Sequence, residues 1–273
     1  MAHRGVLARP IEEKRSRSAK LGILRRAKGS EPFRWLVRNI VAPSYFLTFF
    51  KTLEAKIIAE YLEARPGERV CDLACGTGER SLTLTDKGCS SYGIDVDRHS
   101  IEMATYLFHE TGAFIQADGE RLPFKSETFD KALSICALEH FSDDQAALRE
   151  AYRILKPGGV FVITVDSLNY NGLGERLKEE HKVENHVVRY YTRQELEAKL
   201  RSNSFSVESS KYFISSPVAA FFFNLWIRRV WVCSLLYPVA VCLSYLGDRL
   251  AERPDQGYLL AVKARKNGVD RGG

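Results

Sequence analysis

The sequence predicts an α/β protein with a mostly parallel sheet that is covered by helices on both faces. Short apolar segments alternate with helical segments between about residues 68 and 165. One of these segments, Val160–Val165, is almost continuously apolar, as is typical of a parallel strand buried on both faces. A third observation is the strand, glycine turn and helix start at Val70–Glu79, an arrangement typical of nucleotide-binding α/β domains.

The predicted elements follow in a regular order. A helix is expected before Pro66-Gly67, which ends it. Alternating elements follow: strands at 69–73, 91–95, 113–117, 129–136 and 160–165, and helices from 79, 98 and 143. A polar stretch after Asp166 leads to a helix at 192–202, whose Thr192 and Glu195 form a capping-box pattern. Strands are expected again at 205–214 and 257–264.

Charge and apolar content divide the chain into five parts. The formal net charge is +6, and residues 1–30 hold nine basic residues against two acidic ones. We interpret that segment as a disordered, solvated tail or as a patch that meets anionic lipid; a nucleic-acid arm is the weakest option. The expected parts are the tail at 1–30, helices at 31–66, a cofactor-binding domain at 67–212, an apolar helical insertion at 213–247, and a last strand with a basic tail at 248–273.

The six cysteines show no spacing typical of a zinc site, so no metal is expected. We interpret them as reduced, as in the cytoplasm. The first 20 residues contain no apolar run of the kind found in a signal peptide. The sequence therefore predicts a cytoplasmic protein.

The glycine turn indicates which cofactor the domain takes. Glycines let the backbone turn tightly and approach a ligand, and the following helix start offers free N–H groups. A dinucleotide fingerprint would need a third glycine where Ser81 stands. Asp72, just before the turn, would repel a pyrophosphate but could accept hydrogen bonds from an ammonium group. The turn therefore favours S-adenosylmethionine over a nicotinamide dinucleotide.

This turn and four later motifs resemble the class I S-adenosylmethionine-dependent methyltransferases, type 11-like, over about residues 68–165. Asp72–Gly78 resembles the family's first motif, D-x-G-x-G-x-G, with Ala74 in the first glycine place. The other motifs stand in the family's order: Tyr92–Asp97, Asp118-Gly119, Phe129–Phe141 and Arg153–Gly159. The resemblance implies a Rossmann-like sheet, methyl transfer from S-adenosylmethionine, and S-adenosylhomocysteine as the product.

The resemblance also implies which residues bind the cofactor. Asp95, after the second strand, matches the acid that binds the ribose hydroxyls, and Asp118 matches the position that grips the adenine amino group. The complete expected set is Asp72, Ala74, Gly76, Gly78, Asp95, Val96, Asp118, Gly119 and Cys136.

Methyl transfer from a sulfonium needs orientation and a dry pocket, and needs a protein base only if the acceptor must lose a proton. His140 and His186 are the candidate bases, although a structural role is open for both. His181 is expected to be exposed. Three residues are expected to line the acceptor pocket: Glu139, Tyr190 and Tyr191. The two tyrosines could equally pack against the preceding helix.

The apolar insertion at 213–247 contains two uncharged runs, 213–227 and 230–247, separated by Arg228-Arg229. A membrane-spanning helix needs about 20 apolar residues, and a single crossing would separate the last strand from its sheet. We expect two apolar helices at the strand-end side of the sheet. They could form a lid over an apolar acceptor, a monotopic element in one leaflet, or a dimer interface.

The sequence thus predicts a methyltransferase for a small apolar acceptor such as a quinone, polyprenyl or glycerolipid compound. Peripheral contact with the cytoplasmic face of a membrane is expected through 213–247 and the basic N-terminus, and nucleic acid is not an expected partner. The alternative is a non-catalytic, membrane-associated binding protein with the same fold, which would not need a complete cofactor pocket. A nicotinamide-dependent oxidoreductase is disfavoured by Asp72 and Ser81.

Overall fold

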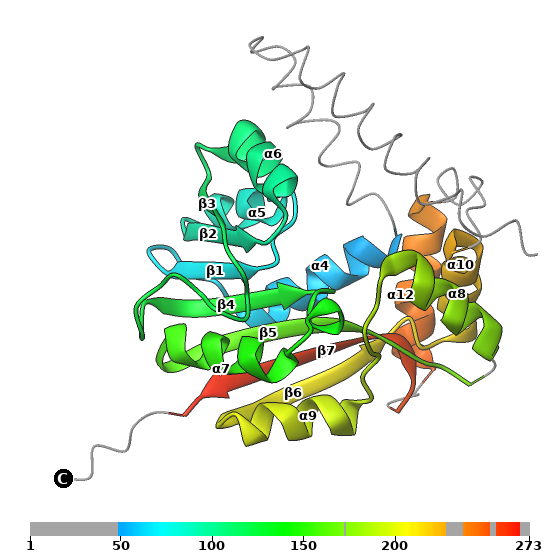
Figure 1. The fold of residues 1–273 in the computed structure, drawn as a ribbon. Coiled ribbons are helices and arrows are strands. Elements are labelled where there is room, and N and C mark those ends of the chain that lie inside the picture. The colour runs from blue at the N-terminus through cyan, green and yellow to red at the C-terminus, as the bar shows by residue number, and fades with distance from the viewer. Residues whose placement is uncertain (1–48, 172, 228–236, 252–254, 268–273) are drawn as a thin grey trace, which may run out of the picture. The chain divides into compact units, whose positions relative to one another are not determined.

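The structure, a computed structural model, describes residues 49–171, 173–227, 237–251 and 255–267 (Figure 1). The chain divides into two units after Pro43, and every described residue belongs to the second unit. The predictions for the basic residues 1–30, for helices within 31–48 and for Arg228-Arg229 lie outside the described residues.

The sheet has seven strands in the order β3-β2-β1-β4-β5-β7-β6. The pairs among the first five strands are parallel, while β7 runs antiparallel to both of its neighbours. The strands are β1 (Arg69–Leu73), β2 (Ser90–Asp95), β3 (Gly112–Gln116), β4 (Phe129–Ile135), β5 (Leu155–Asn169), β6 (Phe205–Phe213) and β7 (Gly257–Lys266). The predicted Rossmann-like, mostly parallel sheet is confirmed.

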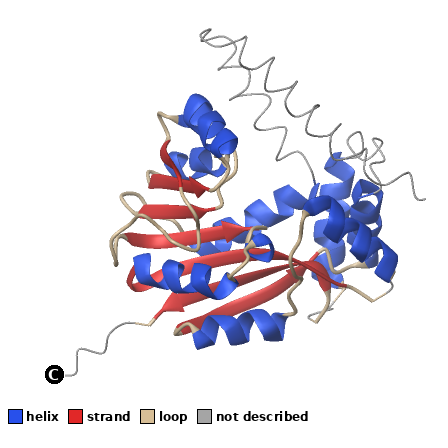
Figure 2. Ribbon diagram, in the orientation of Figure 1, coloured by secondary structure: helices blue, strands red, loops and turns tan. Residues whose placement is uncertain are grey.

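Helices cover both faces of this sheet (Figure 2). Their bounds are α4 (Phe49–Leu62), α5 (Arg80–Asp86), α6 (Arg98–Phe108), the 3-10 turn η2 (Leu138–His140), α7 (Asp144–Ile154), α8 (Glu175–Asn185), α9 (Arg193–Ser202), α10 (Pro217–Ile227) and α12 (Tyr237–Leu250). One apolar core joins the sheet to α4, α10 and α12, and a second joins its other face to α7 and α9. The predicted capping box of Thr192 and Glu195 is present at the start of α9.

Strand β5 is longer than predicted at its start, which lies at Leu155 and not at 160. Gly158 and Gly159 do not interrupt β5. Instead, the register between β4 and β5 shifts between Phe129 and Lys131, and the two strands stay paired on either side of the shift. Gly158, with a φ of +78°, absorbs the irregularity. The sequence suggested a turn there because glycine pairs usually mark one.

The parallel strands bring their carboxyl ends to one edge of the sheet. At that edge β1 lies between β2 and β4, so the strand order reverses there. Open α/β sheets bind ligands in the crevice at such a point. Strand β6 runs parallel to β5, because both are antiparallel to β7, so the chain that leads into α10 also leaves from this edge.

Candidate functional site

The turn after β1 has a backbone that only small residues fit. Gly76 and Gly78 have φ values of +56° and +83°, in the left-handed region that glycine adopts freely. A Cβ on Gly78 would lie 2.7 Å from Cε1 of Phe114. Ala74 stands in the family's glycine place with a φ of +58°, a conformation that costs an alanine roughly 1–2 kcal/mol. The turn is therefore shaped to bring the main chain close to a ligand.

The end of β2 is joined to this turn by hydrogen bonds. The Gly76 N–H donates to Oδ2 of Asp95 at 2.9 Å, and the Cys75 N–H donates to the Ile94 carbonyl at 2.8 Å. The other oxygen of Asp95 accepts from the Asp97 N–H at 2.8 Å. These bonds fix the two loops relative to one another.

A cavity of about 490 Å³ opens beside these loops at the carboxyl edge of the sheet. Its volume is in the range of small-molecule sites. Six of the predicted cofactor residues line it, together with the predicted base His140: Ala74, Asp95, Val96, Asp118, Gly119 and Cys136. The other three, Asp72, Gly76 and Gly78, belong to β1 and its turn.

Asp72 is buried at the end of β1, beneath the turn. Burial raises the pKa of its carboxyl group to about 7, although the nearby Arg80 lowers it. Such a carboxyl group is stabilised in its charged form by an incoming cation. The ammonium group of S-adenosylmethionine is a cation of that kind, so Asp72 and the narrow turn both fit this cofactor. When bound, the cofactor supplies an activated methyl group on a positive sulfur.

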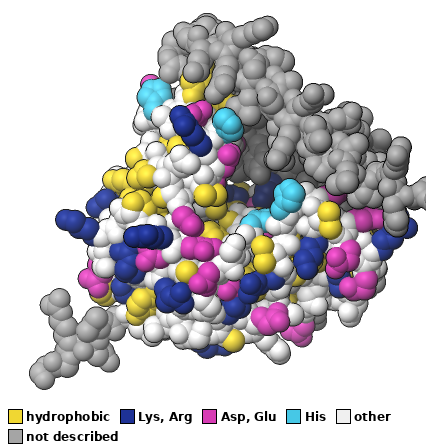
Figure 3. Space-filling view, in the orientation of Figure 1, with side chains coloured by type: hydrophobic (Ala, Val, Ile, Leu, Met, Phe, Trp, Pro, Cys, Tyr) yellow, Lys and Arg dark blue, Asp and Glu magenta, His cyan; other side chains and the backbone are white. Residues whose placement is uncertain are grey.

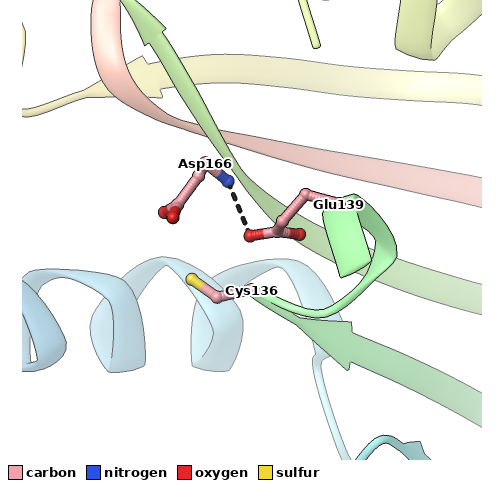
Figure 4. A group of neighbouring side chains, drawn as sticks. All are labelled: Cys136, Glu139 and Asp166. Carbon is pink, nitrogen blue, oxygen red and sulfur yellow. Dashed lines mark hydrogen bonds between the residues drawn. The ribbon is translucent and has the colours of Figure 1, made fainter. Parts of the chain in front are cut away.

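A second group of titratable side chains lies where β4 and β5 end: Cys136, Glu139 and Asp166 (Figure 4). Their sulfur and oxygen atoms lie within 4.8 Å of one another. The Asp166 N–H donates to Oε1 of Glu139 at 2.9 Å. Glu139 is fully buried, and its Oε2 has no hydrogen-bond partner among the described residues. Glu139 is not among the residues that line the cofactor cavity, and its place in an acceptor pocket stays a prediction.

His181 completes this second group, and the prediction that it is exposed is wrong. Its side chain is buried, with Nε2 3.7 Å from Oδ2 of Asp166. Its Nδ1 lies 3.0 Å from the Tyr190 hydroxyl, which donates to the Lys178 carbonyl. Helix α8 is polar along most of its length, so the sequence offered no apolar stripe to mark this inward-facing side chain.

The two histidines predicted as bases are exposed. The ring Nδ1 of His140 lies 3.2 Å from the carbonyl oxygen of His186, which caps α8 in a left-handed conformation. His140 borders the cavity, whereas His186 is not among its lining residues. Tyr191 is buried in the core and donates to Oδ2 of Asp144 at 2.6 Å. Tyr191 was expected either to line the acceptor pocket or to pack, and the structure supports packing.

Glu54 of α4 is a site residue that the sequence analysis missed. It is fully buried and forms ion pairs with Lys51 and Arg80, each at 2.9 Å. It also accepts hydrogen bonds from Thr164 Oγ1 at 2.7 Å and from Cys136 Sγ at 3.0 Å. Burial alone would raise the pKa of Glu54, but the two cations and the hydrogen bonds lower it to about 2. Its signal in the sequence is an acid on the apolar face of a helix.

The comparisons with known proteins agree with this geometry. Residues 71–163 match a family model described as a methyltransferase domain. The demethylmenaquinone methyltransferase of Corynebacterium kroppenstedtii is 39% identical over 108 residues, which are 40% of this chain and 46% of that protein. The sterol 4-C-methyltransferase strm-1 of Caenorhabditis elegans is 30% identical over 135 residues, or 48% of this chain and 40% of that one. The chain thus spans about half the length of the curated relatives it matches.

Among solved structures, the [4+2]-cyclase SpnF superposes with a TM-score of 0.58 and 23% identity over 80% of this chain and 81% of that one. A likeness at this identity shows the fold, and a fold alone does not fix the reaction. The matched residues 71–163 run from β1 into β5 and hold the glycine turn, Asp95 and the cavity. Residues 71–163 are therefore a methyltransferase domain, and the chain carries the class I S-adenosylmethionine-dependent methyltransferase fold.

Proposed function

We propose that the protein transfers a methyl group from S-adenosylmethionine to an apolar small molecule of the quinone or lipid kind. The observation that carries the methyltransferase part is the cavity beside the turn in which Asp95 holds Gly76. In this proposal the turn and Asp72 hold the amino-acid end of the cofactor, Asp95 its ribose, and Asp118 with Gly119 its adenine. The protein orients the two substrates and excludes water, which accounts for much of the rate of such a displacement.

Two observations support an apolar acceptor. The relatives named above are a demethylmenaquinone and a sterol methyltransferase, and both names denote apolar acceptors. The chain also carries an exposed apolar stripe. On α12, exposed side chains recur at spacings of four, three and four residues: Val239, Leu243, Leu246 and Leu250. Val218 and Phe221 of the neighbouring helix α10 are exposed as well.

We call these six residues the outer apolar stripe. They lie on two helices that pack on one another, and an exposed apolar patch normally meets lipid, a partner or a ligand. On the face that carries α7 and α9, acidic and basic side chains are interspersed (Figure 3). By contrast Phe222 and Phe223 are buried, and Phe223 packs on Phe50 of α4 with ring centroids 5.4 Å apart.

We propose that the outer apolar stripe rests in the headgroup region of an anionic membrane. Two exposed cations lie beside it: Arg249 on α12 and Lys56 on α4, whose Nζ sits 3.8 Å from the centre of the Tyr245 ring. None of the helices within the described ranges has the length and apolar content needed to cross a bilayer. A shallow, peripheral attachment fits such helices. A lid over the acceptor and a dimer interface remain the competing uses of the same surface.

The test is transfer of a labelled methyl group from S-adenosylmethionine into lipid extracts by the purified protein. The proposal expects label in the organic phase, in a compound that migrates with quinones or other apolar lipids. Asp95→Ala protein is the control and should give little label. Label found only in water-soluble products would contradict the apolar acceptor, and no label in any fraction would contradict the activity.

A further inference from the structure

The acidic pair Glu139 and Asp166 lies next to the cofactor cavity without being part of it. Cys136 lines the cavity, and its sulfur lies within 4.8 Å of both carboxyl groups. The Glu139 side chain is fully buried, whereas the Asp166 side chain keeps 15% of its surface accessible. Asp166 is therefore the member of the pair with side-chain surface left for contact with another molecule.

Two carboxyl groups this close and this buried cannot both be ionised at low cost. Burial and then the charge of Asp166 raise the pKa of Glu139 well above its usual range. Burial also raises the pKa of Asp166, while His181 lowers it. The charged and titratable groups that face the pair come from four elements: Lys51 and Glu54 of α4, Cys136 after β4, His140 of η2, His181 of α8, and Tyr190 after α8.

The hydrogen bonds define where protons sit around His181. The Tyr190 hydroxyl has one proton, which it donates to the Lys178 carbonyl. Its contact with Nδ1 of His181 therefore requires a proton on Nδ1. The other nitrogen, Nε2, lies 3.7 Å from Oδ2 of Asp166, which is an ion-pair distance. A positive charge on the His181 ring therefore stabilises the ionised form of Asp166, the form that can accept a proton.

We propose that Asp166 accepts a proton from the methyl acceptor, with Glu139 and His181 as its positioning residues. The acceptor is then a molecule with an ionisable hydroxyl. An aromatic hydroquinone combines such a hydroxyl with an apolar body. This inference rests on the proposed function and names its substrate class more narrowly. It also differs from the sequence prediction, which placed the base at His140 or His186.

Attack by the acceptor oxygen moves one proton and one methyl group. The hydroxyl proton of the acceptor moves to an Asp166 oxygen, and the electron pair left on oxygen forms the new bond to the methyl carbon. The bond between that carbon and sulfur breaks with its electrons on sulfur, which gives S-adenosylhomocysteine. In attack by the neighbouring ring carbon, the same proton transfer precedes bond formation. The ring C–H proton then leaves to water, and Asp166 returns its proton to the oxygen, which restores the hydroxyl.

A thiol and two carboxylates are also ligand types for a divalent cation such as zinc. The ammonium group of Lys51 lies 3.6 Å from Cys136 Sγ and opposes a second cation there. The arrangement thus favours a proton over a metal. Metal analysis of the purified protein separates the two readings. One equivalent of bound metal that is lost in Asp166→Asn would overturn the proton proposal.

The buried pair is expected to hold one proton on Glu139, and infrared spectroscopy can detect that proton without any acceptor. At pH 7 the spectrum of wild type minus Glu139→Gln should contain the carbonyl band of a protonated carboxyl group. The matched control is Asp144→Asn, because Asp144 is buried but its hydrogen bonds to Tyr191 and Lys199 outweigh burial and keep its pKa low. Its difference spectrum should show no such band. Absence of the band from the Glu139 difference spectrum would overturn the proposal.

Activity tests the substrate class, with a prenylated 1,4-naphthohydroquinone as the probe and its dimethyl ether as the matched control. Label should enter the hydroquinone and not the ether, which has no ionisable hydroxyl. Asp166→Asn should lower kcat by about 10²–10⁴-fold, the usual contribution of a proton-transfer group. Label in the ether, or in neither compound, would overturn the acceptor class.

The pH profile tests whether His181 acts through Asp166. Because His181 lowers the pKa of Asp166, His181→Gln should move the acid limb of kcat/KM to higher pH. An equal loss of rate at every pH would indicate a merely structural role and contradict the assignment. Binding of S-adenosylhomocysteine by calorimetry is measured without any acceptor and does not require proton transfer to Asp166. A protein that binds it but lacks the infrared band would refute this inference and leave the proposed function intact.

Discussion

The carboxylate of Asp95 accepts a hydrogen bond from the Gly76 N–H at 2.9 Å, so the end of β2 holds the turn after β1 in place. The bond joins residues 19 positions apart, and Asp95 itself lines the cavity. The bond also makes Asp95 both a structural residue and a proposed ligand of the ribose.

Asp95→Ala should weaken binding of S-adenosylhomocysteine by about 1.5–3 kcal/mol, the range for hydrogen bonds to a charged group. A small loss of stability should accompany it, because Gly76 loses its acceptor. The matched control is Asp97→Ala, which removes the cap on Ser100 at the start of α6 but does not line the cavity. Calorimetry should show near wild-type affinity for the control. Unchanged affinity in Asp95→Ala would refute the assignment of this residue.

Gly78→Ala should abolish measurable cofactor binding. The new Cβ would meet the Phe114 ring at 2.7 Å and the Ala104 Cβ at 2.9 Å, and the φ of +83° disfavours any side chain. Left-handed backbone costs roughly 1–2 kcal/mol, and overpacking typically about 1–3 kcal/mol. Gly174→Ala is the control, since nothing lies within 4 Å of its Cβ position and its φ is −69°. Thermal unfolding and calorimetry on both variants test this, and normal binding by Gly78→Ala would show that the turn is not the binding element.

Asp72→Asn should stabilise the free protein at alkaline pH and weaken cofactor binding. The folded pKa of Asp72 is about 7, above its usual 3.8, so the folded state takes up a proton and loses stability as pH rises between these values. The variant should therefore match wild type near pH 4 and unfold at a higher temperature at pH 8. Asp130→Asn is the control of opposite sign. Despite its partial burial, hydrogen bonds from the Arg69 N–H and from Lys156 lower its pKa, so this variant should be less stable at pH 8.

Removing apolar side chains from the outer apolar stripe should release the protein from membranes. Wild-type protein should float with anionic vesicles, and less so at high salt because the basic contribution is screened. Phe221→Ser, Leu243→Ser and Leu246→Ser together should abolish flotation and spare binding of S-adenosylhomocysteine. Val183→Ser is the control, because Val183 is exposed on α8, outside the stripe. A wild-type protein that stays monomeric and does not float would leave only the lid among the uses considered for this surface.

The cofactor half of the site could be predicted from the sequence because it is built from local segments. The glycine turn, Asp95 and Asp118 each follow a strand directly, and strand ends meet at one edge of a parallel sheet. Motifs at these strand ends carry the resemblance to the methyltransferase family, and that resemblance implied the six residues that line one cavity.

The buried titratable residues beside the cavity could not be predicted in the same way. Glu54, Asp166 and His181 come from α4, β5 and α8, and no short motif links them. His181 was expected to be exposed because its helix is polar, yet one side chain of that helix turns inward to Asp166. Which side chains meet across such distances depends on packing of the whole domain. Only Glu54 left a local signal, as an acid between the buried Leu53 and Ile57 of α4.

Calorimetric titration with S-adenosylhomocysteine and with NAD is the most direct test of the cofactor assignment on which the whole account depends. We expect one S-adenosylhomocysteine to bind per chain. Because the pKa of Asp72 is about 7, binding at pH 7 should release part of a proton, seen as a heat that depends on the buffer. NAD should give no heat of binding. Binding of NAD without binding of S-adenosylhomocysteine would contradict the account.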